Sequence, residues 1–151
     1  MQIRPDDLSD PAIHALLDEH LRSMHAQSPA GSVHALDLER LRDPSISFWS
    51  AWDGSTLLGC AALRELDRQH AEIKSMRTPA ARRRQGAGKA LLTYLIGEAR
   101  RRQYRRLSLE TGAQDAFAPA RTLYANAGFV ACGPFGDYQL DPNSVFMTRT
   151  L

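Results

Sequence analysis

The chain has 151 residues and a formal net charge of +2; 43% of its residues are hydrophobic and 24% are charged. This balance is typical of a soluble globular protein and speaks against a dedicated nucleic-acid binder, while the length suits a single domain over residues 1–151. Cys60 and Cys132 lie too far apart for a disulfide framework or a metal-ligand motif, so we expect a reducing cytoplasm and no bound metal. The charged N-terminus and the lack of a long apolar stretch predict neither a signal peptide nor a membrane span.

Periodicity and turn residues divide the chain into strands that alternate with helices. Asp10-Pro11 is typical of a helix cap and first turn, and Asp53-Gly54 between two apolar runs is typical of a β-hairpin. The predicted strands are residues 2–4, 47–52, 56–66, 71–78, 105–111, 129–135 and 144–151. The predicted helices are residues 11–25, 37–41, 86–102 and 118–127. This order predicts a mixed α/β sheet with helices on both faces.

One junction between a strand and a helix has the features of an anion site. The sequence RRRQGAGKALL, residues 82–92, places three arginines and two glycines in front of the helix that begins near Gly86. The N-terminus of a helix attracts anions through its free N–H groups, and Gly86 and Gly88 allow close backbone approach. Arg83 and Arg84 add guanidinium groups that fit phosphate oxygens. The junction predicts a phosphate or pyrophosphate site, although arginines alone also suit a solvated turn.

Two familiar phosphate loops do not fit this junction. A P-loop needs GxxxxGK followed by Ser or Thr, whereas here Ala90 follows Lys89, after glycines only two residues apart. The dinucleotide pattern GxGxxG would require a third glycine where Leu91 stands.

Residues 83–88 instead resemble the [R/Q]xxGx[G/A] loop of the GNAT N-acetyltransferase superfamily. The strand AEIKSMRT before the loop agrees with this family, and Leu123-Tyr124 followed by Gly128-Phe129 is similar to its LYxxxGF segment. Order and spacing agree over residues 71–131. The resemblance implies a small single-domain acetyltransferase with a mixed, mostly antiparallel sheet of about six to seven strands, which uses acetyl-coenzyme A as its cosubstrate.

The resemblance also implies which residues bind coenzyme A. In the family, backbone amides of the glycine loop hold the pyrophosphate, and the pantetheine arm lies along the preceding strand like an added strand. Many members carry Asn seven residues before the tyrosine, where this chain has Phe117, so that contact to the arm is not carried over. The cofactor-binding residues implied are Met76, Thr78, Arg83, Arg84, Gln85, Gly86, Ala87, Gly88 and Lys89.

Acetyl transfer from a thioester to an amine needs a base and an acid, but no covalent enzyme intermediate. The resemblance implies Glu72 as the base, with Glu110 on the next strand as its rival. It implies Tyr124 as the acid that protonates the departing thiolate. Each has a structural alternative, because Glu72 shares a strand face with Lys74 and suits a surface ion pair, and Tyr124 has the spacing of a core residue.

The acceptor side is less specific. Glu110 and His34 are candidate substrate contacts, and so are Asp137 and Tyr138 on the connection between the last strands; a solvated loop histidine and an ordinary turn are the alternatives. The expected acceptor is a primary amine of a small molecule or of a protein. The sequence leaves the oligomeric state open, a homodimer included. A non-catalytic acyl-coenzyme A sensor and a nucleic-acid binder remain as other functions.

Overall fold

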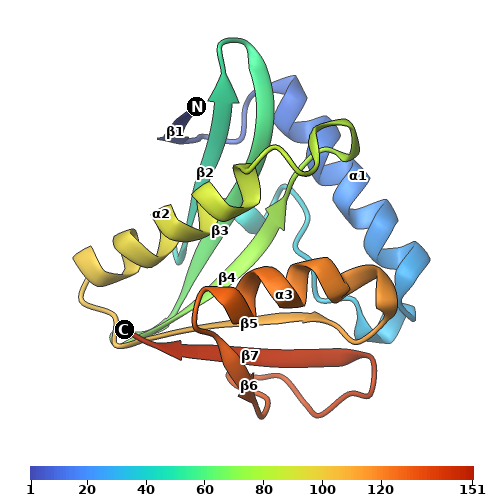
Figure 1. Ribbon diagram of the computed structural model, residues 1–151, viewed down its shortest axis with the longest axis vertical. Coiled ribbons are helices and arrows are strands. Elements are labelled where there is room, and N and C mark those ends of the chain that lie inside the picture. The colour runs from blue at the N-terminus through green and yellow to red at the C-terminus, as the bar shows by residue number, and fades with distance from the viewer.

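The computed structural model describes residues 1–151 as one seven-stranded sheet covered by three α-helices (Figure 1). The strands are β1 (Gln2–Pro5), β2 (Ile46–Asp53), β3 (Thr56–Asp67), β4 (His70–Arg77), β5 (Arg106–Gly112), β6 (Val130–Cys132) and β7 (Ser144–Thr150). The helices are α1 (Pro11–Gln27), α2 (Ala87–Arg101) and α3 (Ala118–Asn126), with four short 3₁₀ turns between elements. The predicted mixed sheet is therefore confirmed.

The strands follow the order β1-β2-β3-β4-β5-β7-β6, and β4 and β5 form the single parallel pair among antiparallel neighbours. Such a pair requires a crossover, which α2 supplies between the two strands. In this order, the parallel pair lies in the middle of the sheet.

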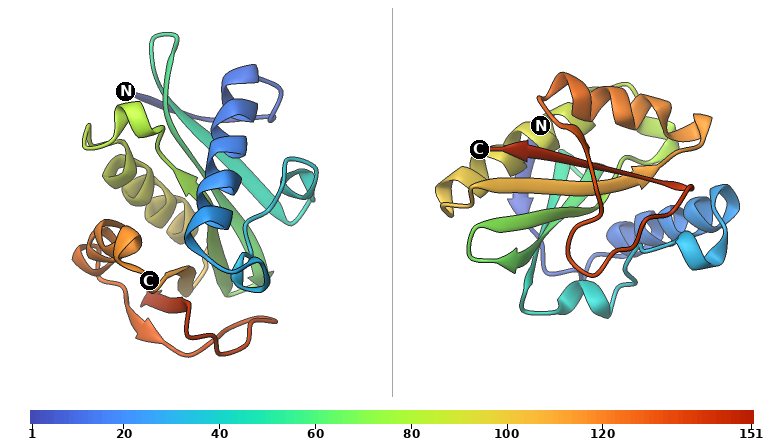
Figure 2. Two further views of the ribbon diagram at one scale, coloured as in Figure 1. Left: turned by 90° about the vertical axis from the view of Figure 1, so that its right-hand side faces the viewer. Right: turned by 90° about the horizontal axis from the view of Figure 1, so that it is seen from below.

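Helices cover both faces of the sheet (Figure 2). On one face, Leu16 and Leu17 of α1 pack with Cys60 and Ala62 of β3. On the other face, α2 and α3 pack against alternate residues of the same strands. The apolar stripe predicted for α2 is buried throughout and consists of Leu91, Leu92, Leu95, Ile96 and Ala99.

Helix α2 lies unusually close to the sheet at Gly59 of β3. A Cβ at this position would stand 2.9 Å from Leu91 Cδ1 and 3.0 Å from the Arg77 carbonyl oxygen. A side chain here would crowd both Leu91 of α2 and the backbone of β4, so glycine suits this close contact.

The central feature of the sheet is a fork between β4 and β5. Their pairing ends at Ile73 and Leu109, although β5 continues along β7 to Gly112. On its other side, β4 carries one extra residue, because Ala62 pairs with Lys74 whereas Cys60 pairs with Arg77. Ser75 within this bulge has a φ of 51°, in the left-handed region. The bulge turns β4 away from β5, and Figure 1 shows the two strands diverging.

Two predicted elements differ in extent. The helix expected near residues 37–41 is a single 3₁₀ turn, Arg40–Arg42, and the strand expected at 129–135 is only Val130–Cys132. The strand is short because Pro134 cannot donate to a ladder, so residues 133–143 leave the sheet edge as a loop. No helix combines the length and the apolar character needed to cross a bilayer.

Candidate functional site

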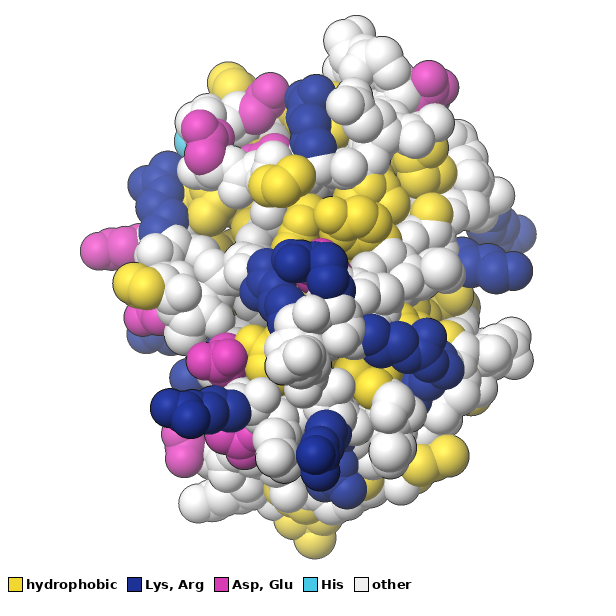
Figure 3. Space-filling model, turned by 90° about the vertical axis from the view of Figure 1, so that its left-hand side faces the viewer, with side chains coloured by type: hydrophobic (Ala, Val, Ile, Leu, Met, Phe, Trp, Pro, Cys, Tyr) yellow, Lys and Arg dark blue, Asp and Glu magenta, His cyan; other side chains and the backbone are white.

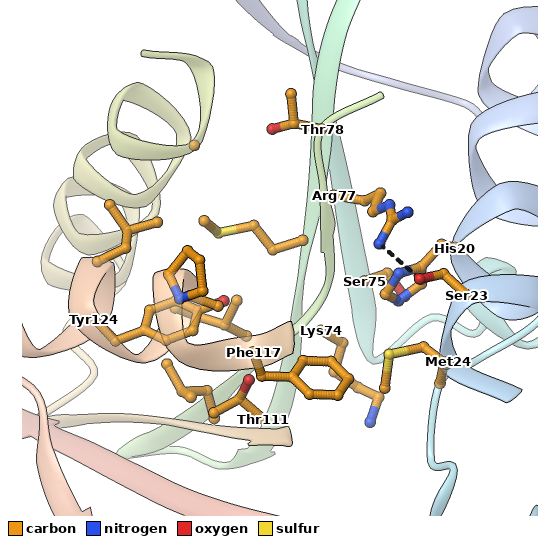
Figure 4. A pocket seen from close by; sticks show the side chains of 18 of the residues that line it. His20, Ser23, Met24, Lys74, Ser75, Arg77, Thr78, Thr111, Phe117 and Tyr124 are labelled. Atoms are coloured by element: carbon orange, nitrogen blue, oxygen red, sulfur yellow. Dashed lines mark hydrogen bonds between the residues drawn. The ribbon is translucent and has the colours of Figure 1, made fainter. Parts of the chain in front are cut away.

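A cavity of about 660 Å³ follows the fork and is lined by α1, β4, the loop before α2, β5 and α3 (Figure 4). One end lies at the N-terminus of α2, and the other lies on the α1 face of the sheet. The fork therefore connects the two faces of the sheet, because β4 and β5 are not hydrogen-bonded to each other beyond Ile73.

The loop before α2 presents free backbone amides to the cavity. The first hydrogen bond of the helix runs from Ala90 N to Gly86 O, so the amides of residues 87–89 have no partner within the helix. Gly86 caps the helix without a side-chain hydrogen bond, at a φ of 84° that favours glycine. A Cβ built on Gly86 would meet no atom within 4 Å, so the space above the amides is open.

Arginine side chains surround these amides. Arg82, Arg83 and Arg84 are exposed and line the cavity together with Lys89. None of them forms an ion pair within the protein. Free amides, the helix dipole and unpaired cations form a site that suits a pyrophosphate.

Tyr124 lies between the hydrophobic core and the cavity. Its ring packs at 6.0 Å from that of Phe129 and belongs to the core, as the structural alternative predicted. Its hydroxyl forms no hydrogen bond within the protein, and the residue lines the cavity (Figure 4). Burial raises the pKa of Tyr124 to about 12, so the hydroxyl keeps its proton at neutral pH and can donate it.

Glu72 does pair with Lys74, as the structural alternative predicted, but the pair is buried and not at the surface. Its side chain is 2% exposed and that of Lys74 is 6% exposed, with Lys74 Nζ 3.4 Å from Glu72 Oε2. Tyr138 joins the two: Lys74 Nζ donates to its hydroxyl at 2.7 Å, and the hydroxyl donates to Glu72 Oε2 at 2.6 Å. Burial and the charge of Glu72 raise the pKa of Tyr138. The sequence singled out Glu72 and Tyr138 separately, and the fold brings them together.

A second carboxylate stands at the fork, held by a histidine. Glu110 is the first β5 residue beyond the pairing with β4, and both its oxygens lie 2.7–2.8 Å from His34 Nδ1. The other ring nitrogen of His34 has no partner in the protein, and the ring lies 5.0 Å from that of Tyr138. Asp137 is exposed and does not line the main cavity, but it lines a neighbouring depression together with His34 and Tyr138.

A polar group between α1 and β4 was not predicted from the sequence. His20 and Ser23 come from α1, and Ser75 and Arg77 come from β4, and they lie together at one wall of the cavity (Figure 4). The available signal was His20, which continues the apolar stripe of Ile13, Leu16 and Leu17 at helical spacing. A histidine on a buried stripe needs a polar partner, but His20 Nδ1 has none within the protein.

Phe117 lines the cavity from the 3₁₀ turn before α3. It packs against Gly112, where an added Cβ would come within 2.1 Å of Phe117 Cδ2. Only glycine fits beneath this ring, so the ring fills its position tightly. The structure contains no group of three or more His, Cys, Asp or Glu side chains that could hold a metal ion.

Basic residues do not form a continuous surface on the face seen in Figure 3. Lys and Arg side chains there are separated by uncharged and acidic ones. Part of the arginine cluster at the end of α2 is neutralised internally, since Glu98 pairs with both Arg101 and Arg102. The Arg101 hydrogen bond, followed by that of Arg102, outweighs burial and lowers the pKa of Glu98 to about 2.

Comparisons with known proteins agree with this geometry. The family model described as Acetyltransferase (GNAT) family matches residues 13–129. The chain is 56% identical over 151 residues to the uncharacterized N-acetyltransferase YsnE of Bacillus subtilis, covering 100% of both chains. Among solved structures, it is similar to an acetyltransferase from Streptococcus agalactiae, with a TM-score of 0.77, 20% identity and coverage of 99% and 98% of the two chains.

A further solved structure is a GNAT family acetyltransferase from Elizabethkingia anophelis with acetyl-coenzyme A bound. It gives a TM-score of 0.69 at 20% identity, covering 99% of this chain and 97% of that one. Homologues with this fold thus bind the cosubstrate that the loop before α2 suits. The chain belongs to the GNAT family of acetyltransferases and is a GNAT N-acetyltransferase.

Proposed function

We propose that the protein moves the acetyl group of acetyl-coenzyme A directly to the amine of an acceptor, with both reactants bound at once. The observation that carries the proposal is the fork, which joins a pyrophosphate-type site on the α2 face to a polar pocket on the α1 face within one cavity. Two reactants entering from opposite faces meet between the strands, so no acetylated enzyme intermediate is required.

The cosubstrate site is built from the loop and from the free part of β4. The amides of residues 87–89 and the guanidinium groups of Arg83 and Arg84 bind the pyrophosphate, and residues 84–88 shape the loop around it. Beyond Ile73, the backbone of β4 at Met76 does not pair with β5, and neither does the backbone at Thr78, which follows β4. They bind the amide-rich arm of the coenzyme as an added strand.

Tyr124 acts as the acid in this proposal. Tyr124 lines the cavity, and its hydroxyl keeps its proton and has no competing partner in the protein. It donates the proton to the sulfur of the departing coenzyme A.

The amine must lose a proton before or during the attack. An amine with a pKa of about 10.4 is neutral in only a few molecules per ten thousand at pH 7, a deficit of roughly 4–5 kcal/mol. Glu72 is one base, although Tyr138 and Lys74 already hold its Oε2 and only Oε1 is unpaired. The second route is His34, oriented by Glu110 as a base is oriented by a carboxylate in a catalytic triad.

Three substitutions separate these routes. If His34 takes the proton, His34→Gln lowers kcat/KM and removes the pH dependence of the rate, while Glu110→Gln has a smaller effect of the same kind. If Glu72 takes the proton, Glu72→Gln has the larger effect and His34→Gln leaves the pH profile intact. Acetyl-coenzyme A affinity serves as the control, because none of the three side chains belongs to the loop that binds the pyrophosphate.

The function itself is tested by measuring turnover of acetyl-coenzyme A with a panel of primary amines. Release of the free thiol of coenzyme A is the measured signal. Acetylation of at least one amine, with rates that depend on both reactants in the pattern of a ternary complex, is the expected result. Binding of acetyl-coenzyme A without turnover on any amine would instead assign the protein as an acyl-coenzyme A sensor. Steeply salt-dependent DNA binding without coenzyme A binding would assign it as a nucleic-acid binder.

A further inference from the structure

Three buried polar atoms without a partner lie at the same wall of the cavity, between α1 and β4. They are His20 Nδ1, Ser75 Oγ and Arg77 Nε. His20 and Ser75 are more than nine-tenths buried, and all three residues line the cavity. A buried polar group without a hydrogen bond is destabilising by about 1–3 kcal/mol, so three in one place indicate a binding site for a polar ligand group.

Arg77 is the charged donor of this wall, whereas neutral His20 and Ser75 can each donate or accept a hydrogen bond. The Arg77 guanidinium contributes N–H groups only, and its internal contacts are long: an ion pair with Glu19 Oε1 at 3.3 Å and a hydrogen bond to Ser23 Oγ at 3.5 Å. Burial, followed by the charge of Arg77, lowers the pKa of His20 to about 4, so the imidazole is neutral and adds no second charge. One loosely held guanidinium with hydroxyl groups beside it suits a carboxylate.

The coenzyme does not account for this wall. Its phosphates belong to the loop before α2, on the opposite face of the sheet from α1. The Arg77 side chain points toward α1, where it reaches Glu19 and Ser23 (Figure 4). The wall therefore belongs to the half of the cavity that receives the acceptor.

The position of Ser75 indicates how far apart the amine and the anionic group of the acceptor lie. Ser75 lies in the bulge of β4, two residues beyond Ile73, the last residue paired with β5, so it stands beside the fork where the amine must attack. The same side chain contributes to the donor wall. An acceptor that reaches both places needs its amine and its carboxylate only a few bonds apart. Met24 and Phe117 line the cavity nearby and offer apolar surface to the rest of the molecule.

We infer that the acceptor is an α-amino acid whose carboxylate binds to Arg77, Ser75 and His20 while its amine reaches the fork between β4 and β5. This inference rests on the proposed acetyl transfer and specifies its substrate class. The amine nitrogen forms the amide bond to the acetyl carbon, the carbon–sulfur bond breaks, and the amine proton leaves through the base as the thiolate is protonated.

The test compares each of the twenty common amino acids with its amide as the acceptor. The amide loses only the negative charge, and its amine gives up a proton more readily, so chemistry alone would favour the amide. We expect at least one amino acid to be preferred over its amide by about 10–100-fold in kcat/KM, the value of a hydrogen bond to a charged group. Amides that are acetylated as fast as the acids would overturn the inference while leaving acetyl transfer intact.

Arg77→Gln and Glu19→Gln form a matched pair of variants. Arg77→Gln removes the cation and is expected to bring the ratio of acid to amide close to one, mainly through a higher KM for the acid. Glu19→Gln removes an internal partner of Arg77 and keeps the cation, so the preference for the acid should persist. An equal loss on acids and amides in Arg77→Gln, with an unchanged ratio, would show that Arg77 is only structural and would overturn the inference.

Calorimetry separates failure of the inference from failure of the proposed function. The twenty amino acids are titrated into the protein saturated with coenzyme A, which requires no turnover. Binding of an amino acid that Arg77→Gln removes, without acetylation of any amine, would support the carboxylate site and contradict acetyl transfer. Acetylation of simple alkylamines without amino-acid binding would support the transfer and contradict the carboxylate site.

Discussion

Glu72→Gln tests how the buried group of Glu72, Lys74 and Tyr138 is held together. The substitution keeps the shape and the hydrogen bond from Tyr138, but it leaves the Lys74 cation without a counter-charge in a site where its side chain is 6% exposed. Removing one partner of a buried ion pair is destabilising by about 3–5 kcal/mol. Because Gln still accepts the hydrogen bond, we expect the lower end, about 3 kcal/mol.

For a chain of this size, each kcal/mol shifts Tm by about 2–4 °C, so Glu72→Gln should unfold about 6–12 °C below the wild type. Glu110→Gln is the matched control, because its partner His34 is 31% exposed and solvent screens the pair. The free energy of unfolding of Glu110→Gln should fall by no more than about 1 kcal/mol. Differential scanning calorimetry measures both.

The double variant Glu72→Gln/Lys74→Met removes the orphaned cation and should recover most of the lost stability. If Glu72→Gln unfolds at the same temperature as Glu110→Gln, or if the double variant is less stable than the single one, the buried pair is not what holds this group. The result also bears on catalysis, since a rate loss in Glu72→Gln identifies a base only when measured on fully folded protein.

Three further outcomes are expected. Gly86→Val places a side chain at a φ of 84° above the free amides and should abolish the rise in Tm that acetyl-coenzyme A causes. Gly54→Val is the control, because it introduces the same kind of strain at a φ of 58° in the β2–β3 turn and should keep the rise in Tm. If both variants respond equally to acetyl-coenzyme A, the phosphate site lies elsewhere. Tyr124→Phe should lower turnover by about 10²–10⁴-fold while Tm changes little, and unchanged turnover at every pH would leave Tyr124 as a core residue alone. His20 has a pKa of 6.5 when unfolded and about 4 when folded, so the unfolded state binds the proton first and about 3 kcal/mol of stability should be lost as pH falls from 6.5 to 4. Urea unfolding across this range checks it, and the same slope in His20→Gln would exclude the histidine as its cause.

The sequence was informative wherever a local pattern determines structure. Leu91, Leu92 and Leu95 predicted the buried face of α2 because helical periodicity is local, and Asp53-Gly54 predicted the hairpin because its turn requires a positive φ. The glycines before α2 predicted an anion site because a helix N-terminus has the same free amides in any fold. All three features depend on neighbours along the chain. The helix face and the hairpin are confirmed by the structure, whereas the anion site stays a prediction.

The rest of the site depends on contacts between distant segments. The bulge at Ser75 follows from the register of β4 against β3, which no local pattern encodes. Tyr138 reaches Glu72 because residues 133–143 leave the sheet edge and fold back over the α1 face, a path set by tertiary packing. For the same reason Lys74, which looked like a surface partner of Glu72, is buried with it.

The most direct measurement is a crystal structure of the protein with acetyl-coenzyme A. We predict pyrophosphate oxygens within hydrogen-bonding distance of the amides of residues 87–89, the pantetheine arm along β4 beyond Ile73, and the thioester sulfur facing the Tyr124 hydroxyl. A coenzyme bound away from the loop before α2, or a thioester that does not enter the fork between β4 and β5, would contradict the mechanism of direct transfer between the two faces of the sheet.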